Sequence, residues 1–242
     1  MTDMSNKSAL GIFFRIPAPC KVKKRLAAEI GEKAAHNAYE RMLHETIKSV
    51  SRLRGIDLYG FYEGELISLN LFSSSGNPPT LPLEKGGKGG FEKGGDFELI
   101  EKLPLYSQKG VELGERMCNA IKWLFYKGYE KVSLVGADSP DLPISYVTEA
   151  FEKLDAYDIV IGPSEDGGYY LIGMNKPHEV IFEGIQWGHE TVLRDTICRA
   201  KSAGVSYFLL PEWYDIDDLD GLNRWRLKNL AHSEIDKDLK SR

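Results

Sequence analysis

Apolar runs rich in β-branched and aromatic residues recur along this chain, and helical patterns lie between them. Strands that alternate with helices build a sheet covered by helices, so the pattern predicts an α/β fold rather than a sandwich or a helical bundle. Six strands are expected, at Ala9–Arg15, Asp57–Tyr62, Lys131–Ala137, Asp158–Gly162, Tyr169–Met174 and Val205–Leu210.

The helical patterns complete this plan. A long one runs from Arg25 to Arg54, and Gly31 is the point where it is expected to bend or break. The strands at 158–162 and 169–174 follow each other closely and are expected to be antiparallel, which makes the sheet mixed. With 242 residues, the chain is expected to form one domain, residues 1–242. Further helices are expected at Leu113–Tyr126, Ser145–Lys153, Glu190–Ala203 and Asp220–Ala231.

Residues 76–96 do not follow this alternation. They contain three Lys-Gly-Gly tripeptides, which begin at Lys85, Lys88 and Lys93. Such a segment buries too little apolar surface to offset its ordering entropy, so a mobile surface insertion is expected. Glycines and lysines could instead cradle phosphate, although no GxxxxGK[ST] pattern is present.

The net charge and the cysteine content argue against some classes of function. With 31 Lys and Arg against 36 Asp and Glu the net charge is −5, so binding along a nucleic-acid backbone is not expected. The three cysteines form no CxxC pair and are odd in number, which is typical of a reducing cytoplasm and argues against a zinc site. Neither a secretion signal nor a membrane span is expected from the sequence. Oligomeric state is left open.

In residues 133–141, an apolar strand runs directly into two carboxylates, Asp138 and Asp141. Open α/β sheets bind their ligands at the carboxyl ends of strands, and Mg²⁺ or Mn²⁺ takes oxygen ligands and often bridges to substrate phosphates. The same residues also suit a helix start. Asp138 is the favoured metal ligand, and Asp141 is expected to cap the helix after Pro143.

A basic segment follows the first strand. Between Arg15 and Arg25 it holds Lys21, Lys23 and Lys24, at the point where a strand leads into a helix. Backbone N–H groups and basic side chains at such a turn favour phosphate binding, while a solvated charged face is the alternative.

Three further segments carry candidate residues. In 103–117, Gln108, Gly110 and Arg116 could approach a base, ribose or phosphate, although an ordinary helix start explains the segment too. In 162–170, Glu165 and Asp166 could orient or deprotonate an acceptor hydroxyl, and a hairpin turn is the alternative.

The last of these segments, 213–220, places Asp215, Asp217 and Asp218 within four residues, more acids than helix capping needs. One of them is expected to complete a metal site with Asp138, because a divalent cation relieves their mutual repulsion. Trp187 is open to two interpretations, as part of the core or as a platform for a sugar or base.

Taken in order, PxPxxVKxRL, QxGxxLGERM, GADSPDLP, GPxEDGGYYLIG and DID span nearly the whole chain. This set resembles an uncharacterised bacterial family of GT-A-type glycosyltransferases related to 2-phospho-lactate guanylyltransferase and molybdenum-cofactor guanylyltransferase. The resemblance implies a three-layer αβα, Rossmann-like nucleotide-diphospho-sugar transferase fold with a mixed, mostly parallel sheet. It also implies Asp138 and Asp217 as ligands of Mg²⁺ or Mn²⁺.

The expected function is a metal-dependent transferase that uses a nucleotide-sugar or a nucleoside triphosphate and a small-molecule acceptor. Glycosyl transfer is slightly preferred. Nucleotidyl transfer to a small phosphorylated acid is the alternative, because both reactions need the same clamp on the diphosphate. Cys20 and Lys24 replace the glycine and threonine usual in the family, which leaves a non-catalytic nucleotide-binding relative as a third interpretation. The nucleotide is expected to contact Arg15, Lys21, Lys23, Arg25, Gln108, Gly110 and Arg116, and the catalytic candidates are Asp138, Glu165 and Asp166.

Overall fold

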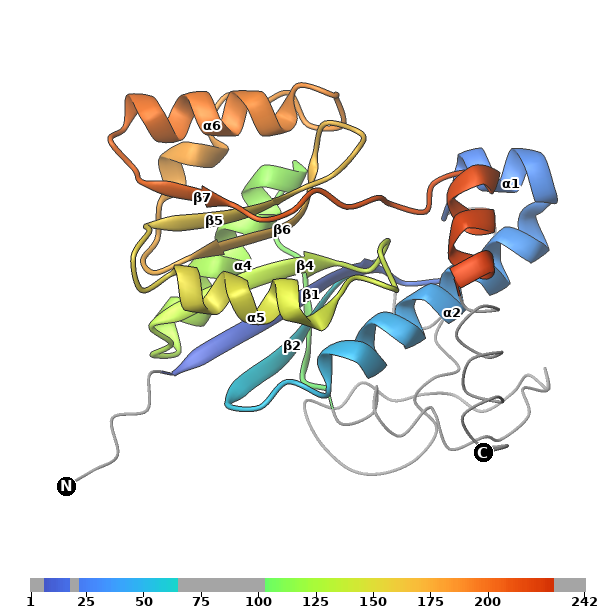
Figure 1. Ribbon diagram of the computed structural model, residues 1–242, viewed down its shortest axis with the longest axis horizontal. Coiled ribbons are helices and arrows are strands. Elements are labelled where there is room, and N and C mark those ends of the chain that lie inside the picture. Colours follow the sequence, from blue (N-terminus) through green and yellow to red (C-terminus); the bar gives the residue numbers. More distant parts are fainter. Residues whose placement is uncertain (1–6, 18–21, 65–102, 229–242) are drawn as a thin grey trace, which may run out of the picture.

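The computed structural model of the protein describes residues 7–17, 22–64 and 103–228, so the 76–96 segment lies outside the described residues. Within the described part, one seven-stranded sheet passes through the middle of the molecule and carries helices on both faces (Figure 1). This three-layer αβα arrangement confirms the fold class that the alternation of strands and helices predicts.

The strand order is β3-β2-β1-β4-β6-β5-β7. Strand β6 is antiparallel to both of its neighbours, whereas the other pairs are parallel, so the sheet is mixed and mostly parallel. The close pair β5 and β6 is antiparallel as expected. The strands are β1 (Ser8–Arg15), β2 (Ile56–Glu63), β3 (Leu105–Ser107), β4 (Lys131–Gly136), β5 (Ile159–Pro163), β6 (Tyr169–Met174) and β7 (Tyr207–Leu209).

The helices follow the expected plan closely. Gly31, at φ 85°, separates the long helical pattern into α1 and α2, because this backbone conformation suits glycine and ends the first helix. Strand β3 and the short 3₁₀ helix were not expected. The helices are α1 (Lys24–Ile30), α2 (Glu32–Val50), α4 (Leu113–Tyr126), α5 (Ile144–Lys153), α6 (Val192–Ser202), the 3₁₀ helix η3 (Glu179–Phe182) and a helical segment at 219–228.

Residues that alternate along the strands divide the core into two layers. Leu10 and Val135 point to the face covered by α2 and α5, whereas their neighbours Ala9 and Leu134 point to the face covered by α4, η3 and α6. Period-two alternation in strands produces this division, and burial of apolar area on both faces, worth about 25 cal/mol per Å², holds the layers together.

A third cluster lies beyond the end of the sheet. Leu26 of α1 and Met42 of α2 pack against Leu222 and Trp225 of the 219–228 segment, and all four are at most 3% exposed. The chain reaches this cluster directly after β7 (Figure 1). The cluster therefore fixes the beginning of α1 and the residues before 219 against the same end of the sheet.

That end is the carboxyl edge of the parallel strands, where open α/β sheets bind ligands. Strands β1, β2, β4 and β5 end there, and the antiparallel β6 begins there with Tyr169. Among the described residues, no helix has the length and apolar character needed to cross a lipid bilayer.

Candidate functional site

Two carboxylates from distant segments meet at the carboxyl edge. Asp138 follows β4, and Asp217 lies between β7 and the 219–228 helix. The Ile216 amide donates a hydrogen bond of 2.9 Å to the carbonyl of Asp138, which ties the two segments together. The two acids therefore lie close together, as expected from the sequence. Their role as metal ligands stays a prediction.

The ammonium group of Lys23 joins the two carboxylates. Its Nζ lies 2.7 Å from Asp138 Oδ1 and 2.7 Å from Asp217 Oδ1. The Lys23 side chain is only 6% exposed, whereas the two carboxylates are 46% and 44% exposed. The three side chains form what we call the Lys23 triad: a buried cation between two acids that also face solvent.

The backbone of Lys23 is unusual. With φ 49° and ψ 53° it is left-handed, and it is the one non-glycine residue with positive φ in the described part of the chain. This conformation costs a lysine about 1–2 kcal/mol. The surrounding contacts therefore hold the residue in place against local strain, which is common at functional sites.

Electrostatics within the triad favour the charged forms of Lys23 and Asp217. Burial opposes the charge on Lys23, but the neighbouring Asp138 and Asp217 outweigh it and raise its pKa above the ordinary 10.5. Burial acts against ionisation of Asp217 as well, yet the Lys23 ammonium lowers the pKa of that carboxyl below its ordinary 3.8.

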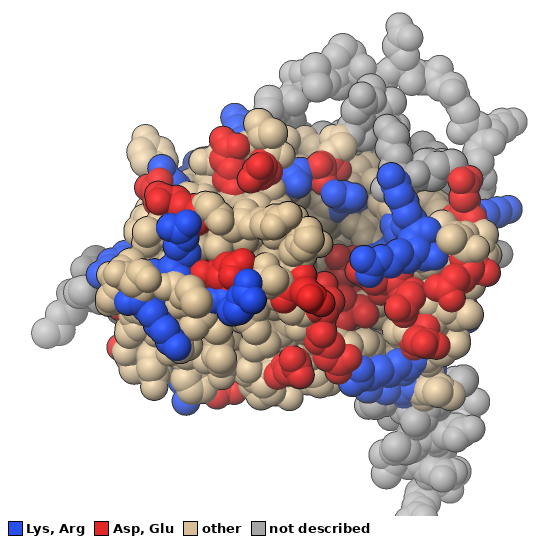
Figure 2. Space-filling view, turned by 90° about the horizontal axis from the view of Figure 1, so that it is seen from above, with Lys and Arg blue, Asp and Glu red and all other residues tan. Residues whose placement is uncertain are grey.

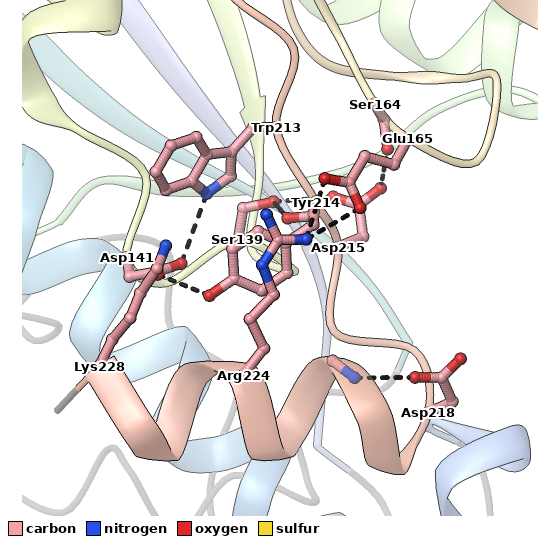
Figure 3. A network of polar contacts seen from close by, with 11 residues as sticks. Ser139, Asp141, Ser164, Glu165, Trp213, Tyr214, Asp215, Asp218, Arg224 and Lys228 are labelled. Carbon is pink, nitrogen blue, oxygen red and sulfur yellow. Dashed lines mark hydrogen bonds and ion pairs between the residues drawn. The ribbon is translucent and has the colours of Figure 1, made fainter. Parts of the chain in front are cut away.

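Asp215, Asp217 and Asp218 have different surroundings. Asp215 accepts hydrogen bonds from Ser139 Oγ, at 2.7 Å, and from Ser164 Oγ, and its burial raises its pKa to about 6. Asp218 instead accepts from the Gly221 amide at 2.9 Å, as a cap of the 219–228 helix (Figure 3). Only Asp217 of the three joins the Lys23 triad.

Three of the predicted nucleotide-binding residues, Arg15, Gln108 and Arg116, lie near the ends of β1, β2 and β3 and at the start of α4. Glu63, the last residue of β2, binds Arg116 and also accepts from Arg15 Nε at 2.8 Å. Gln108 donates through Nε2 to the carbonyls of Phe14 and Phe61, at 3.2 and 3.0 Å, so its amide nitrogen is engaged with the backbone of β1 and β2.

Glu63 and Tyr39 were missed by the sequence reasoning. Burial raises the pKa of Glu63, but the two guanidinium groups outweigh it and lower the pKa overall. The Tyr39 hydroxyl accepts from the Arg15 amide at 2.9 Å and fixes the end of β1. The place of Glu63 at a strand's carboxyl end could have indicated it, whereas no local pattern indicates Tyr39.

Gly110 lies before α4 in a conformation that only glycine adopts easily. Its φ is 133°, and a Cβ there would lie 3.0 Å from the Arg116 backbone nitrogen. Gly110 therefore lets the loop pack closely onto the first turn of α4. Lys21 lies outside the described residues, and Arg25 is exposed at the start of α1.

Glu165 and Asp166 both lie at the carboxyl edge, as predicted, but their carboxylates are engaged elsewhere. Glu165 binds Arg224 through both oxygens, each at 2.9 Å. Asp166 accepts from the Gly168 amide at 2.9 Å within its own turn, as the hairpin interpretation expects. Neither residue lines the pocket described below.

The expectation that Asp141 caps α5 is wrong. The residue at the helix start is Pro143, with no side-chain cap, and Asp141 instead accepts hydrogen bonds from Tyr214, at 2.6 Å, and from Lys228, at 2.9 Å (Figure 3). Lys228 also lies over the ring of Trp213, 4.2 Å from its centroid. These partners are distant in sequence, so Asp141 anchors the 219–228 helix to the β4–α5 loop.

A pocket of about 870 Å³ opens at the carboxyl edge. On the side of the molecule that carries α1, at the right of Figures 1 and 2, acidic and basic side chains lie directly beside one another. The pocket is lined by the Lys23 triad and by two further sets of residues. The charged and polar ones are Arg15, Lys24, Arg25, Glu63, Gln108 and Arg116, and the apolar and aromatic ones include Val111, Leu113, Met117, Tyr169 and Trp187.

Trp187 closes the apolar side of this pocket. Its ring stands edge-on to Tyr169, with centroids 6.3 Å apart, and lies on Gly114 of α4. A Cβ at Gly114 would come within 2.3 Å of the indole. The glycine thus makes room for the ring, and Trp187 belongs both to the core and to the pocket wall.

The donor set of the triad suits a hard divalent cation. In the described residues no group of three or more His, Cys, Asp or Glu side chains gathers as a metal site would, so protein alone supplies at most two carboxylates. Mg²⁺ and Mn²⁺ are often bound in this way, with phosphate oxygens and waters as the remaining ligands. Two half-exposed carboxylates that already share one cation fit such an ion.

The sheet order, the helices on both faces and the charged pocket at the carboxyl edge together define the nucleotide-diphospho-sugar transferase type of α/β fold. Residues 74–189 match a family described as "Uncharacterized protein conserved in bacteria (DUF2064)". A "putative nucleotide-diphospho-sugar transferase" from Desulfovibrio desulfuricans G20 is 32% identical, covering 90% of this chain and 85% of its own, with a TM-score of 0.71. The protein belongs to the same family as this relative.

Two more distant structures share the fold. A CMP:2-keto-3-deoxy-manno-octonic acid synthetase in complex with CTP has 8% identity and a TM-score of 0.54, covering 93% of this chain and 100% of its own. A Mycobacterium tuberculosis H37Rv protein, Rv0371c, in complex with manganese has 10% identity and a TM-score of 0.50, covering 90% and 97%. No curated protein matches the sequence significantly.

Proposed function

We propose that the protein is a metal-dependent transferase that binds a nucleotide-sugar and transfers its glycosyl group to a small-molecule acceptor. The observation that carries the proposal is the Lys23 triad on a pocket of about 870 Å³ at the carboxyl edge of the sheet. A pocket of this size has room for a nucleotide, and both charge signs are available for a diphosphate and its metal.

In this proposal Asp138 and Asp217 hold Mg²⁺ or Mn²⁺. Support comes from their half-exposed carboxylates and from the manganese complex of the M. tuberculosis protein, which shares the fold. Once bound, the metal would neutralise negative charge on the diphosphate of the nucleotide-sugar. Asp138, which lies two residues after the central strand β4, is the catalytic candidate in this proposal.

The basic residues of the pocket serve the phosphates. Arg15, Arg25 and Arg116 line it in the described part, and Lys21 belongs to the same basic segment. Glu63 holds Arg15 and Arg116 in place. Both guanidinium groups would stay preorganised for an anion, which is what lets fixed charges stabilise a developing negative charge.

Gln108 and Gly110 are given a positioning role. Gln108 holds the ends of β1 and β2 together through two backbone carbonyls, and Gly110 allows the close packing that sets the entry to α4. Their effect on the nucleotide would then pass through the shape of the pocket wall.

For Glu165 and Asp166 we propose a role in the β5–β6 turn rather than in deprotonation of the acceptor. The bidentate pair with Arg224 and the hydrogen bond within the turn support this assignment. A base must reach the proton that it takes, and neither residue lines the pocket.

Nucleotidyl transfer from a nucleoside triphosphate is the second candidate. Basic side chains gather along the pocket, which suits the larger charge of a triphosphate, and a CTP-bound synthetase has the same fold. Both reactions need the diphosphate and metal clamp, so the fold alone does not separate them.

The two candidates release different products. The purified protein would be incubated with Mn²⁺ and each of a panel of nucleotide-sugars and nucleoside triphosphates, with a mixture of small acceptors. Release of nucleoside diphosphate supports glycosyl transfer, and release of pyrophosphate supports nucleotidyl transfer. Binding without either product would identify a non-catalytic relative, and no binding of any nucleotide would refute the proposal.

A further inference from the structure

Lys23 stands where a metal ion would have to be. Its Nζ is within 2.7 Å of one oxygen from each carboxylate, so a cation shared by Asp138 and Asp217 would compete for the same space and the same charge. An ammonium group and a divalent ion repel each other strongly at contact distance. Simultaneous contact of both with this pair of oxygens is therefore unfavourable.

The position of Lys23 is built into the fold. Val22 and Leu26, on either side of it, are 6% and 0% exposed, so the backbone beside Lys23 is anchored in the core. The left-handed backbone directs a side chain that is 6% exposed onto the two acids. The neighbouring Lys24, in contrast, is exposed and lines the pocket without an ion pair to either acid of the triad.

We propose that Lys23 is an internal counter-ion that the metal displaces, and that the freed ammonium then contacts a phosphate of the nucleotide. The inference rests on the proposed function. In the absence of ligand, one positive charge offsets two carboxylates. A divalent ion would offset both, and Lys23, which lines the same pocket, would be left to pair with the added phosphate.

Coupling between the two ligands follows. The metal alone must break two ion pairs and leave Lys23 without a partner, whereas metal and diphosphate together replace both. Metal and diphosphate should therefore each strengthen the binding of the other, by the same factor, as linkage requires. Lys23 is thus a positioning residue that makes metal binding conditional on the substrate.

The first test measures Mn²⁺ affinity by calorimetry, with and without inorganic pyrophosphate as the probe, in three proteins. The wild type should bind Mn²⁺ about tenfold or more tightly with pyrophosphate than without, within the usual range of coupling. Lys23→Met should bind Mn²⁺ alone about tenfold more tightly than the wild type and lose most of the coupling.

Lys24→Met removes the same charge from the next residue and is the matched control. Its Mn²⁺ affinity without pyrophosphate should stay within about twofold of the wild type, because Lys24 makes no contact with the acids. If Lys23→Met binds Mn²⁺ no more tightly than the wild type, the inference is overturned while the proposed function stands. If no protein binds Mn²⁺ even with pyrophosphate, both fail together.

The second test uses the wild type alone and does not depend on the folding of a variant. Amine acetylation followed by peptide mass spectrometry should leave Lys23 protected in the metal-free protein and modify Lys24. Saturating Mn²⁺ should make Lys23 reactive, and added pyrophosphate should protect it again. A Lys23 that stays unreactive in the Mn²⁺-saturated protein would show that the metal does not displace it.

Discussion

Asp215 lies next to the Lys23 triad but has a different chemistry. Two serine hydroxyls hold its carboxylate, and burial, opposed by these hydrogen bonds, raises its pKa to about 6. A buried carboxylate that is easier to protonate than in water makes the folded state less stable once it ionises. Ionised Asp215 therefore destabilises the folded form of the loop that carries Asp217.

Replacement of Asp215 by Asn should reveal this destabilisation, because the difference in unfolding free energy between the variant and the wild type should depend on pH. Because the folded pKa of Asp215 is raised above the unfolded value of 3.8, its favourable contribution is present below pH 4 and is lost as pH rises through about 6. As the pH rises from 4 to 7, the free energy of unfolding of Asp215→Asn should therefore increase relative to that of the wild type, by about 3 kcal/mol at most. Urea unfolding at pH 4, 5.5 and 7.5 measures the difference, and a constant difference would contradict the pKa assignment.

Glu165 tests the assignment of the β5–β6 turn. Its pair with Arg224 is half-exposed on both sides, so Glu165→Gln should lower the free energy of unfolding by less than about 1 kcal/mol. Nucleotide affinity and turnover should stay near the wild-type values, measured by calorimetry and product release. Loss of turnover with intact nucleotide binding would instead return Glu165 to the role of an acceptor base.

The regular elements could be predicted well because each carries its own pattern. Strand β6 and helix α4 have the expected bounds, since apolar periodicity within their own residues defines them. Strand β3 could not be predicted, because its three residues are ordered by pairing with β2 at the edge of the sheet. The local sequence shows the periodicity of an element, but it does not show whether a short segment becomes a strand by pairing with a neighbouring strand.

The candidate site likewise has a part that could be predicted from the sequence and a part that could not. That Asp138 and an acid of 215–218 lie close together could be predicted, because acids that follow parallel strands lie at one edge of a sheet. The choice of Asp217 among these acids came from the family resemblance. The ion pairs of Lys23 and the hydrogen bonds that Asp141 accepts from Tyr214 and Lys228 could not, since each joins segments far apart in the chain. Such contacts depend on tertiary packing, which neither spacing nor propensity describes.

Helix α4 offers a test of the pocket wall. Gly114→Ala would place a methyl group within 2.3 Å of the Trp187 ring and should lower the free energy of unfolding by about 1–3 kcal/mol, as overpacking does. Urea unfolding and tryptophan fluorescence would detect the change.

Gly136→Ala is the matched control, because nothing lies within 4 Å of the added carbon and its φ is not in the left-handed region. Its stability should change little or rise slightly. Equal effects of the two substitutions would contradict the tight packing of Trp187 on Gly114.

At the scale of the whole molecule, the site depends on the third hydrophobic cluster, which contains Leu26, Met42, Leu222 and Trp225 and lies beyond the end of the sheet. This cluster joins α1, which follows Lys23, to the 219–228 helix, which follows Asp217. The sheet supplies Asp138 independently. The triad therefore needs three parts of the chain to dock correctly, and weakening the cluster should affect metal binding as well as stability.

Two leucines of the same helix separate these effects. Leu222 is 1% exposed and Leu227 is 66% exposed. Leu222→Ala should cost about 2–5 kcal/mol and weaken Mn²⁺ binding in the presence of pyrophosphate. Leu227→Ala should change stability by less than about 0.5 kcal/mol and leave metal binding unchanged. Urea unfolding and calorimetry measure both, and similar behaviour of the two variants would contradict the docking of this helix.

In the proposed function, Asp138 and its partners form a metal-dependent nucleotide site. The most direct measurement is calorimetric titration of a nucleotide panel into the wild type and Asp138→Ala, with and without Mn²⁺. At least one nucleotide should bind the wild type in a Mn²⁺-dependent manner, and the folded variant should lose that binding. Undiminished binding to Asp138→Ala, or no binding of any nucleotide to the wild type, would contradict the account.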